Sequence, residues 1–156
     1  MVHATAPTAV KNQQLLFVPY ITAGFFCVMA VLQLVNFEGF VNSIEQYHLS
    51  AQPGSIILAV TLIGLEILAM PFLLLLWMSR LGRWFSASFV LLLPLVWLFL
   101  QLWAAGRGQT LTNAGLFGDL VPLASGTIAF GVTILLAVLA VWSFCVLDGI
   151  KAWRMR

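Results

Sequence analysis

The sequence predicts an all-α integral membrane protein: a bundle of four transmembrane helices with both termini in the cytoplasm and a short amphipathic helix in the first outer loop. Composition is the first observation behind this prediction, because 62% of the 156 residues are hydrophobic and only 8% are charged. Soluble domains are about 45–50% apolar and about 25% charged. The formal net charge of +2 provides no basic surface for nucleic acid, and two cysteines cannot form a disulfide scaffold.

Four long apolar stretches are the second observation. A hydrocarbon core about 30 Å thick requires roughly 20 apolar residues in a helix that rises about 1.5 Å per residue. None of the stretches alternates between apolar and polar residues with a period of two, so the sequence favours helices over barrel strands. The predicted spans are Leu15–Phe37, Ser55–Met78, Trp84–Trp103 and Leu120–Leu147.

The basic residues near the span ends predict the orientation. Six of them lie on one side of the spans and only Arg107 lies on the other, and positive charge marks the cytoplasmic side. We therefore expect a multi-pass protein of the bacterial inner membrane, with a cytoplasmic tail at 1–14, a single transmembrane domain at 15–150 and a basic cytoplasmic tail at 151–156. The six residues are Lys11, Arg80, Arg83, Lys151, Arg154 and Arg156.

The two outer loops differ in character. The first has apolar residues at helical spacing (Phe37, Phe40, Val41, Ile44 and Tyr47) opposite a polar, acidic face. We expect a short helix in the outer interface, either a lid over the bundle end or, as the alternative, a docking surface for a partner. The second loop, GRGQTLTNAGLFGD, is predicted to be a compact connector or an interaction loop. The candidate partner-contact residues of both loops are Glu38, Glu45, Tyr47, His48, Arg107 and Asp119.

Glu66 is the one ionisable residue near the middle of a predicted span. An ionised carboxylate there costs at least a few kcal/mol, so we expect its side chain to face the bundle and to be protonated or hydrogen-bonded. Two interpretations are open: a proton site or polar ligand contact, and an interhelical hydrogen bond that fixes the bundle. The candidate partners are Thr22, Gln33, Asn36, Thr61 and Gln101, of which Gln33, Asn36 and Gln101 complete the predicted buried polar site.

Other motifs are informative by their absence from the sequence. Neither histidine lies in a span, because His3 is in the tail and His48 in the first outer loop, which excludes haem held by intramembrane histidines. The chain has no CxxC, P-loop, GxSxG or HExxH motif. No catalytic residue and no metal site are therefore predicted, and enzymatic activity is disfavoured without being excluded. No cofactor is expected to be bound through side-chain ligands. A bound quinone or lipid is still compatible with the sequence.

The pattern resembles the DoxX/MauE-like superfamily of small four-helix membrane proteins. The matching stretches are AVLQLVNFEGFVNSIEQYHL, with Ala30, Gln33, Asn36, Phe40 and Tyr47, and TLIGLEILAMPFLLL, with an acid at Glu66. The segment NAGLFG resembles the CGCFG segment of the MauE branch, with Ala114 and Leu116 in place of its two cysteines, and Gln33 stands where many relatives have lysine. The resemblance implies a four-helix fold and a link to respiratory or periplasmic redox systems, and the missing cysteines imply that this chain performs no thiol exchange.

Three functions are compatible with these features, in descending order. The first is a non-catalytic integral-membrane subunit, or an assembly or stabilising factor, of a larger respiratory or periplasmic redox complex. It implies contacts with membrane lipids and with other subunits or further copies of the chain, and none with nucleic acid. The second is a DoxX-like quinone-linked oxidoreductase component with Glu66 in a buried pocket. The third is a small transporter, for which the spans contain few polar residues.

Overall fold

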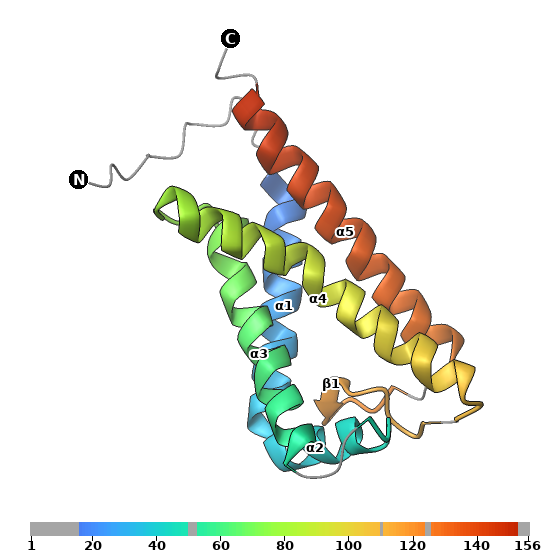
Figure 1. Ribbon diagram of the computed structural model, residues 1–156. Coiled ribbons are helices and arrows are strands. Elements are labelled where there is room, and N and C mark those ends of the chain that lie inside the picture. The colour runs from blue at the N-terminus through green and yellow to red at the C-terminus, as the bar shows by residue number, and fades with distance from the viewer. Residues whose placement is uncertain (1–15, 50–52, 110, 124–125, 153–156) are drawn as a thin grey trace.

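The computed structural model describes residues 16–49, 53–109, 111–123 and 126–152. Within them the regular secondary structure is helical apart from one four-residue extended segment, which confirms the helical fold class (Figure 1). The predicted tail at 1–14 and the basic residues Arg154 and Arg156 lie outside the described residues. The elements are α1 (Phe17–Val35), α2 (Phe37–Glu45), α3 (Gly54–Leu73), α4 (Arg80–Gly106), β1 (Leu116–Asp119) and α5 (Thr127–Ala152).

Helices α1, α3, α4 and α5 are each long and apolar enough to cross a membrane. Their outward faces carry large exposed apolar side chains, among them Ile57, Leu95 and Leu135. Such continuous apolar exposure along every long helix is expected of a surface that meets lipid and is rare on a soluble monomer. Four such helices are expected of a multi-pass membrane protein.

Three predicted span boundaries are wrong, each for a local reason. Helix α3 ends at Leu73 rather than Met78, because Leu75 takes a left-handed backbone conformation with φ 55°. Helix α4 begins at Arg80, before Trp84, because the Ser79 hydroxyl caps it by accepting from the Gly82 N–H at 3.1 Å. Helix α5 begins at Thr127 rather than Leu120, because Leu123 makes loop hydrogen bonds with Ala114 and Asn113 instead of helical ones.

Toward one end α1 and α3 separate from α4 and α5, and the short elements lie at that end (Figure 1). Helix α1 packs against α3 and α5, while α4 packs against α3 and α5. Figure 1 shows α2 and β1 together at the end of the molecule opposite the start of α1 and the end of α5. β1 lies against both α1 and α2. We call residues 36–48 and 111–123 the end cap.

Polar side chains join the long helices where they are buried. Thr22 of α1 and Ser143 of α5 share a hydrogen bond of 3.0 Å. Gln101 of α4 donates to the Ala129 carbonyl at 3.2 Å and to the Thr133 hydroxyl at 2.5 Å, both on α5. Hydrocarbon provides no water for such groups, so each one fixes a pair of helices in register.

Ser86 joins α3 to α4 at the proline of α3. Pro71 has no N–H, which removes one hydrogen bond from the helical ladder near the end of α3. The Ser86 hydroxyl inserts at this turn: it donates to the Leu68 carbonyl at 2.6 Å and accepts from the Phe72 N–H at 3.0 Å. The hydroxyl thus bridges two backbone groups of the turn that proline interrupts, and it draws α4 against the end of α3.

The end cap is organised by the buried side chain of Asn113. Its Nδ2 donates to the Ser43 hydroxyl, the Gly118 carbonyl and the Asp119 carboxylate, at 3.2, 2.9 and 3.3 Å. Its Oδ1 accepts from the N–H groups of Gly115 and Leu123, at 2.9 and 3.3 Å. Four of these five hydrogen bonds fold the loop on itself, and the one to Ser43 joins the loop to α2.

Helix α2 turns its apolar side toward the bundle. Its first turn is capped by Asn36, whose Oδ1 accepts from the Gly39 N–H at 3.2 Å. Phe40, Val41 and Ile44 are buried, and the Phe40 ring packs against Trp97 of α4 with their centroids 6.4 Å apart. In the structure α2 therefore covers the bundle end with its apolar face, while Glu38 remains exposed on the other side.

The close approach of β1 to α1 requires a glycine at position 118. Gly108 is a matched control that separates the steric effect at Gly118 from backbone strain. Gly118 and Gly108 have nearly the same left-handed φ, 65° and 66°. A Cβ at Gly118 would lie 3.1 Å from the Leu32 carbonyl oxygen, whereas a Cβ at Gly108 would meet nothing within 4 Å. We expect Gly108→Ala to cost about 1–2 kcal/mol of unfolding free energy through backbone strain alone. Gly118→Ala should cost at least about 1 kcal/mol more, because it adds steric overlap.

Thermal and denaturant unfolding of both variants in mild detergent measures this difference. Equal destabilisation by the two substitutions would mean that β1 does not sit tightly on α1.

Candidate functional site

A buried polar cluster joins α1, α3 and β1 near the end cap. Gln33 of α1 donates through Nε2 to Glu66 Oε1 of α3 at 3.0 Å. The same nitrogen donates to the backbone carbonyl of Leu116 in β1 at 2.9 Å. Gln33, Glu66 and Leu116 have no exposed surface. Two hydrogens on one nitrogen therefore link two membrane helices to the loop that closes the bundle.

Trp97 of α4 brings a fourth element to this cluster. Its side chain is fully buried and its indole lies beside the Glu66 carboxyl group. Three polar atoms here have no hydrogen-bond partner: Gln33 Oε1, Glu66 Oε2 and Trp97 Nε1. Two of these atoms are acceptors if Glu66 is ionised, and the third is a donor. Buried polar atoms are normally paired, so the cluster is incomplete with a bare carboxylate.

Protonation of Glu66 changes the number of hydrogen-bond donors and acceptors in the cluster. A protonated Oε2 has a donor for Gln33 Oε1 and retains a lone pair for the Trp97 N–H. Glu66 and Gln33 would then face each other as a reciprocal acid–amide pair, with each side chain donating once and accepting once. Among the described side chains no cation contacts Glu66, so nothing in that part of the chain compensates an ionised form.

The other predicted members of the buried site lie elsewhere. Asn36 caps α2, and Gln101 pairs with α5, so the prediction that they join Glu66 is wrong. Thr22 binds Ser143, while Thr61 is exposed and donates to the Ile57 carbonyl of its own helix at 2.7 Å. Short polar side chains on a helix commonly satisfy themselves on the previous turn. Of the candidate partners, the structure brings Gln33 alone to Glu66.

The predicted partner-contact residues divide into exposed and buried ones. Glu38, His48, Arg107 and Asp119 are exposed. The Arg107 guanidinium lies 4.3 Å from the centre of the Trp103 ring, and Glu45 is half-buried and accepts from the Ser55 hydroxyl at 3.1 Å.

Tyr47 does not face outward as that prediction required. It is fully buried and its hydroxyl donates to the Ala114 carbonyl at 2.8 Å. Burial raises the pKa of the Tyr47 hydroxyl, which keeps it protonated as a donor. Its role is therefore to hold the 111–123 loop on α2.

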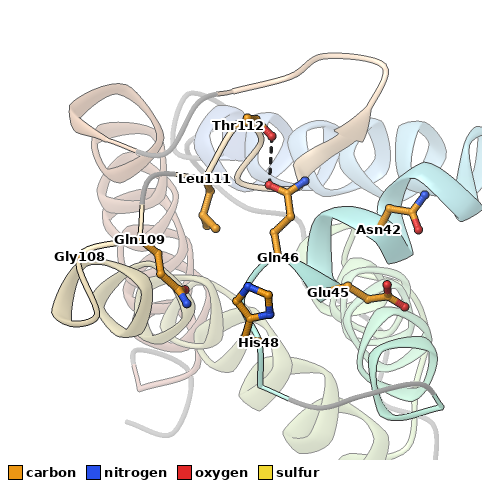
Figure 2. A pocket seen from close by; sticks show the side chains of 8 residues that line it. All are labelled: Asn42, Glu45, Gln46, His48, Gly108, Gln109, Leu111 and Thr112. Carbon is orange, nitrogen blue, oxygen red and sulfur yellow. Dashed lines mark hydrogen bonds between the residues drawn. The ribbon is translucent and has the colours of Figure 1, made fainter.

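An open hollow lies on the outside of the end cap. It has a volume of about 580 Å³ and is lined by residues of the 42–48 and 108–112 segments. Figure 2 shows the two segments facing each other, with Gln46 and Thr112 joined across the hollow by a hydrogen bond of 3.1 Å. His48 stands at this rim with a left-handed φ of 49°, a conformation uncommon for a residue with a side chain. The hollow is polar, so it suits a polar partner surface.

Metal ligands do not gather in the described part of the chain. No group of three or more His, Cys, Asp or Glu side chains is found there. Cys27 and Cys145 are free and exposed on the long helices, which places them on the apolar exterior.

Two residues that matter most for the site were not predicted. Trp97 is one of six bulky apolar or aromatic residues in a row between Pro94 and Gln101, and nothing in the local sequence marks its indole N–H as facing Glu66. Asn113 lies in a glycine-rich loop where a turn-forming side chain is ordinary. Its five hydrogen bonds depend on segments that meet only in the fold.

Comparison with known family models, with curated proteins and with solved structures finds no match for this chain. The resemblance to DoxX/MauE-like proteins therefore depends on the sequence motifs alone.

Proposed function

We propose that this protein is a non-catalytic integral-membrane subunit, or an assembly or stabilising factor, of a larger respiratory or periplasmic redox complex in the bacterial inner membrane. The observation that carries this proposal is the complete burial of the Glu66 cluster between the helices that it joins. The only ionisable side chain deep in a described span is used to join α1, α3 and β1. An acid buried in this way supports architecture rather than turnover.

The protonated form of Glu66 belongs to the same proposal. In that form Glu66 carries a donor that suits the unpartnered Gln33 Oε1 and keeps an acceptor that suits the unpartnered Trp97 N–H. The cluster then needs neither a ligand nor a proton path. It functions as a fixed interhelical joint, which is the role expected of a scaffold subunit.

The end cap is the surface that we propose for the partner. It is held rigidly by Asn113 and Tyr47, and it presents exposed polar side chains around the open hollow. Rigid surfaces bind with a smaller loss of conformational entropy than mobile loops. The apolar sides of the long helices supply further area for contacts with neighbouring membrane subunits.

A quinone-linked oxidoreductase component is the second candidate, and one observation favours it. A quinone carbonyl would accept from Trp97 Nε1, which has no partner. Glu66, Gln33 and Trp97 are fully buried, so a quinone would have to displace β1 to reach them. This candidate therefore predicts a bound quinone in the purified protein, whereas the scaffold proposal predicts none.

Substitutions at Glu66 test whether the cluster is a neutral joint. We expect Glu66→Gln to retain the unfolding temperature in detergent, because an amide keeps one donor and one acceptor toward Gln33. Glu66→Leu should lose about 1–3 kcal/mol, since it leaves buried polar groups unpaired. Thr61→Val, on the same helix but exposed, is the control and should change little. If Glu66→Gln unfolds as readily as Glu66→Leu, the negative charge is required and the neutral-joint account fails.

Purification from native membranes in mild detergent tests the proposed function directly. We expect native mass spectrometry to find the chain in a stoichiometric complex with another membrane protein, and an absorption spectrum to report any pigment that the partner carries. A chain that emerges alone and without a partner contradicts the subunit proposal. A quinone in the organic extract of that isolated chain would favour the second candidate.

Charge reversal at the end cap tests where the partner binds. Glu38→Lys and Arg107→Glu alter exposed side chains at this end and should lower partner retention about three- to tenfold, as expected for exposed charged contacts. Arg80→Glu is the matched control, because it reverses an exposed charge at the opposite end of α4. If the control lowers retention as much as the end-cap variants do, the end cap is not the docking surface.

A further inference from the structure

The turn between α3 and α4 concentrates uncompensated positive charge. Arg80 is exposed and Arg83 is half-buried, both near the start of α4. Neither guanidinium forms an ion pair with a described side chain; that of Arg83 lies 5.6 Å from the centre of the Phe72 ring. Arg83 Nε is buried and has no hydrogen-bond partner. Positive charge is least favourable at the start of a helix. An anion bound between Arg80 and Arg83 would offset this unfavourable interaction.

Exposed apolar side chains, which we call the collar, flank the two arginines in the chain. Two indoles in it are typical of side chains that lie at the level of lipid headgroups. A soluble anion would use the arginines and leave this collar unexplained, whereas a phospholipid contacts both. The collar residues are each more than half exposed: Leu76, Trp77, Leu81, Trp84 and Phe85.

The geometry points to a site for an anionic phospholipid, with its phosphate bound by Arg80 and Arg83 and its acyl chains along the collar. Guanidinium groups match phosphate oxygens in geometry and charge. The site lies at the opposite end of α4 from Arg107, whose guanidinium is stacked on Trp103. It is independent of the end cap and of the Glu66 cluster, so it stands whether or not the proposed function holds.

Lipid titration of the purified full chain tests this site. The protein is delipidated in mild detergent and titrated with phosphatidylglycerol or with phosphatidylcholine, and bound lipid is counted by native mass spectrometry. We expect phosphatidylglycerol to bind the wild-type chain about tenfold more tightly than phosphatidylcholine. The double variant Arg80→Gln/Arg83→Gln should lose this preference, and Arg107→Gln should keep it. Unfolding temperatures without added lipid verify that the double variant is folded.

A conservative double variant tests the role of charge independently of folding. Arg80→Lys/Arg83→Lys keeps both positive charges and should retain most of the preference for phosphatidylglycerol. The proposal is overturned if the wild type shows no preference, if the glutamine double variant retains it, or if Arg107→Gln loses it equally. Full displacement of the lipid by millimolar inorganic phosphate would also overturn it, because the site would then recognise a free anion.

Discussion

The two hydrogen bonds donated by the Gln33 amide nitrogen join α1, α3 and β1 at the buried acid of the bundle. One reaches Glu66 of α3 and the other reaches the Leu116 carbonyl of β1. In hydrocarbon neither acceptor has water as an alternative partner, so removing the amide would leave both without their donor. The positions of α1, α3 and the closing loop are therefore linked through one side chain.

The end cap follows from that constraint. For the Leu116 carbonyl to reach Gln33, β1 must lie against the backbone of α1, which Gly118 permits. The loop must then be held at this depth, and Asn113 and Tyr47 do so from the side of α2. The cap is thus the closing layer of the buried cluster.

The two ends of the bundle differ in chemistry, and this difference organises the functional proposals. One end carries the cap, with exposed Glu38, His48 and Asp119 and with a polar hollow that His48 helps to line. The other carries Arg80 and Arg83 within an apolar collar. A scaffold subunit needs a rigid surface for its partner and a firm position in the bilayer, and the two ends provide features suited to these separate tasks.

The sequence by itself determined the four apolar helices, because bilayer thickness sets their length and composition alone reveals it. It also identified Glu66 and included Gln33 among its partners, because a lone acid in an apolar span must find a polar neighbour. It could not choose Gln33 over Asn36, Thr61 and Gln101, since depth and rotation of each helix come from packing. Only the tertiary structure brought Leu116 to Gln33 and Trp97 to Glu66, because these contacts join segments far apart in the chain whose approach no local pattern encodes.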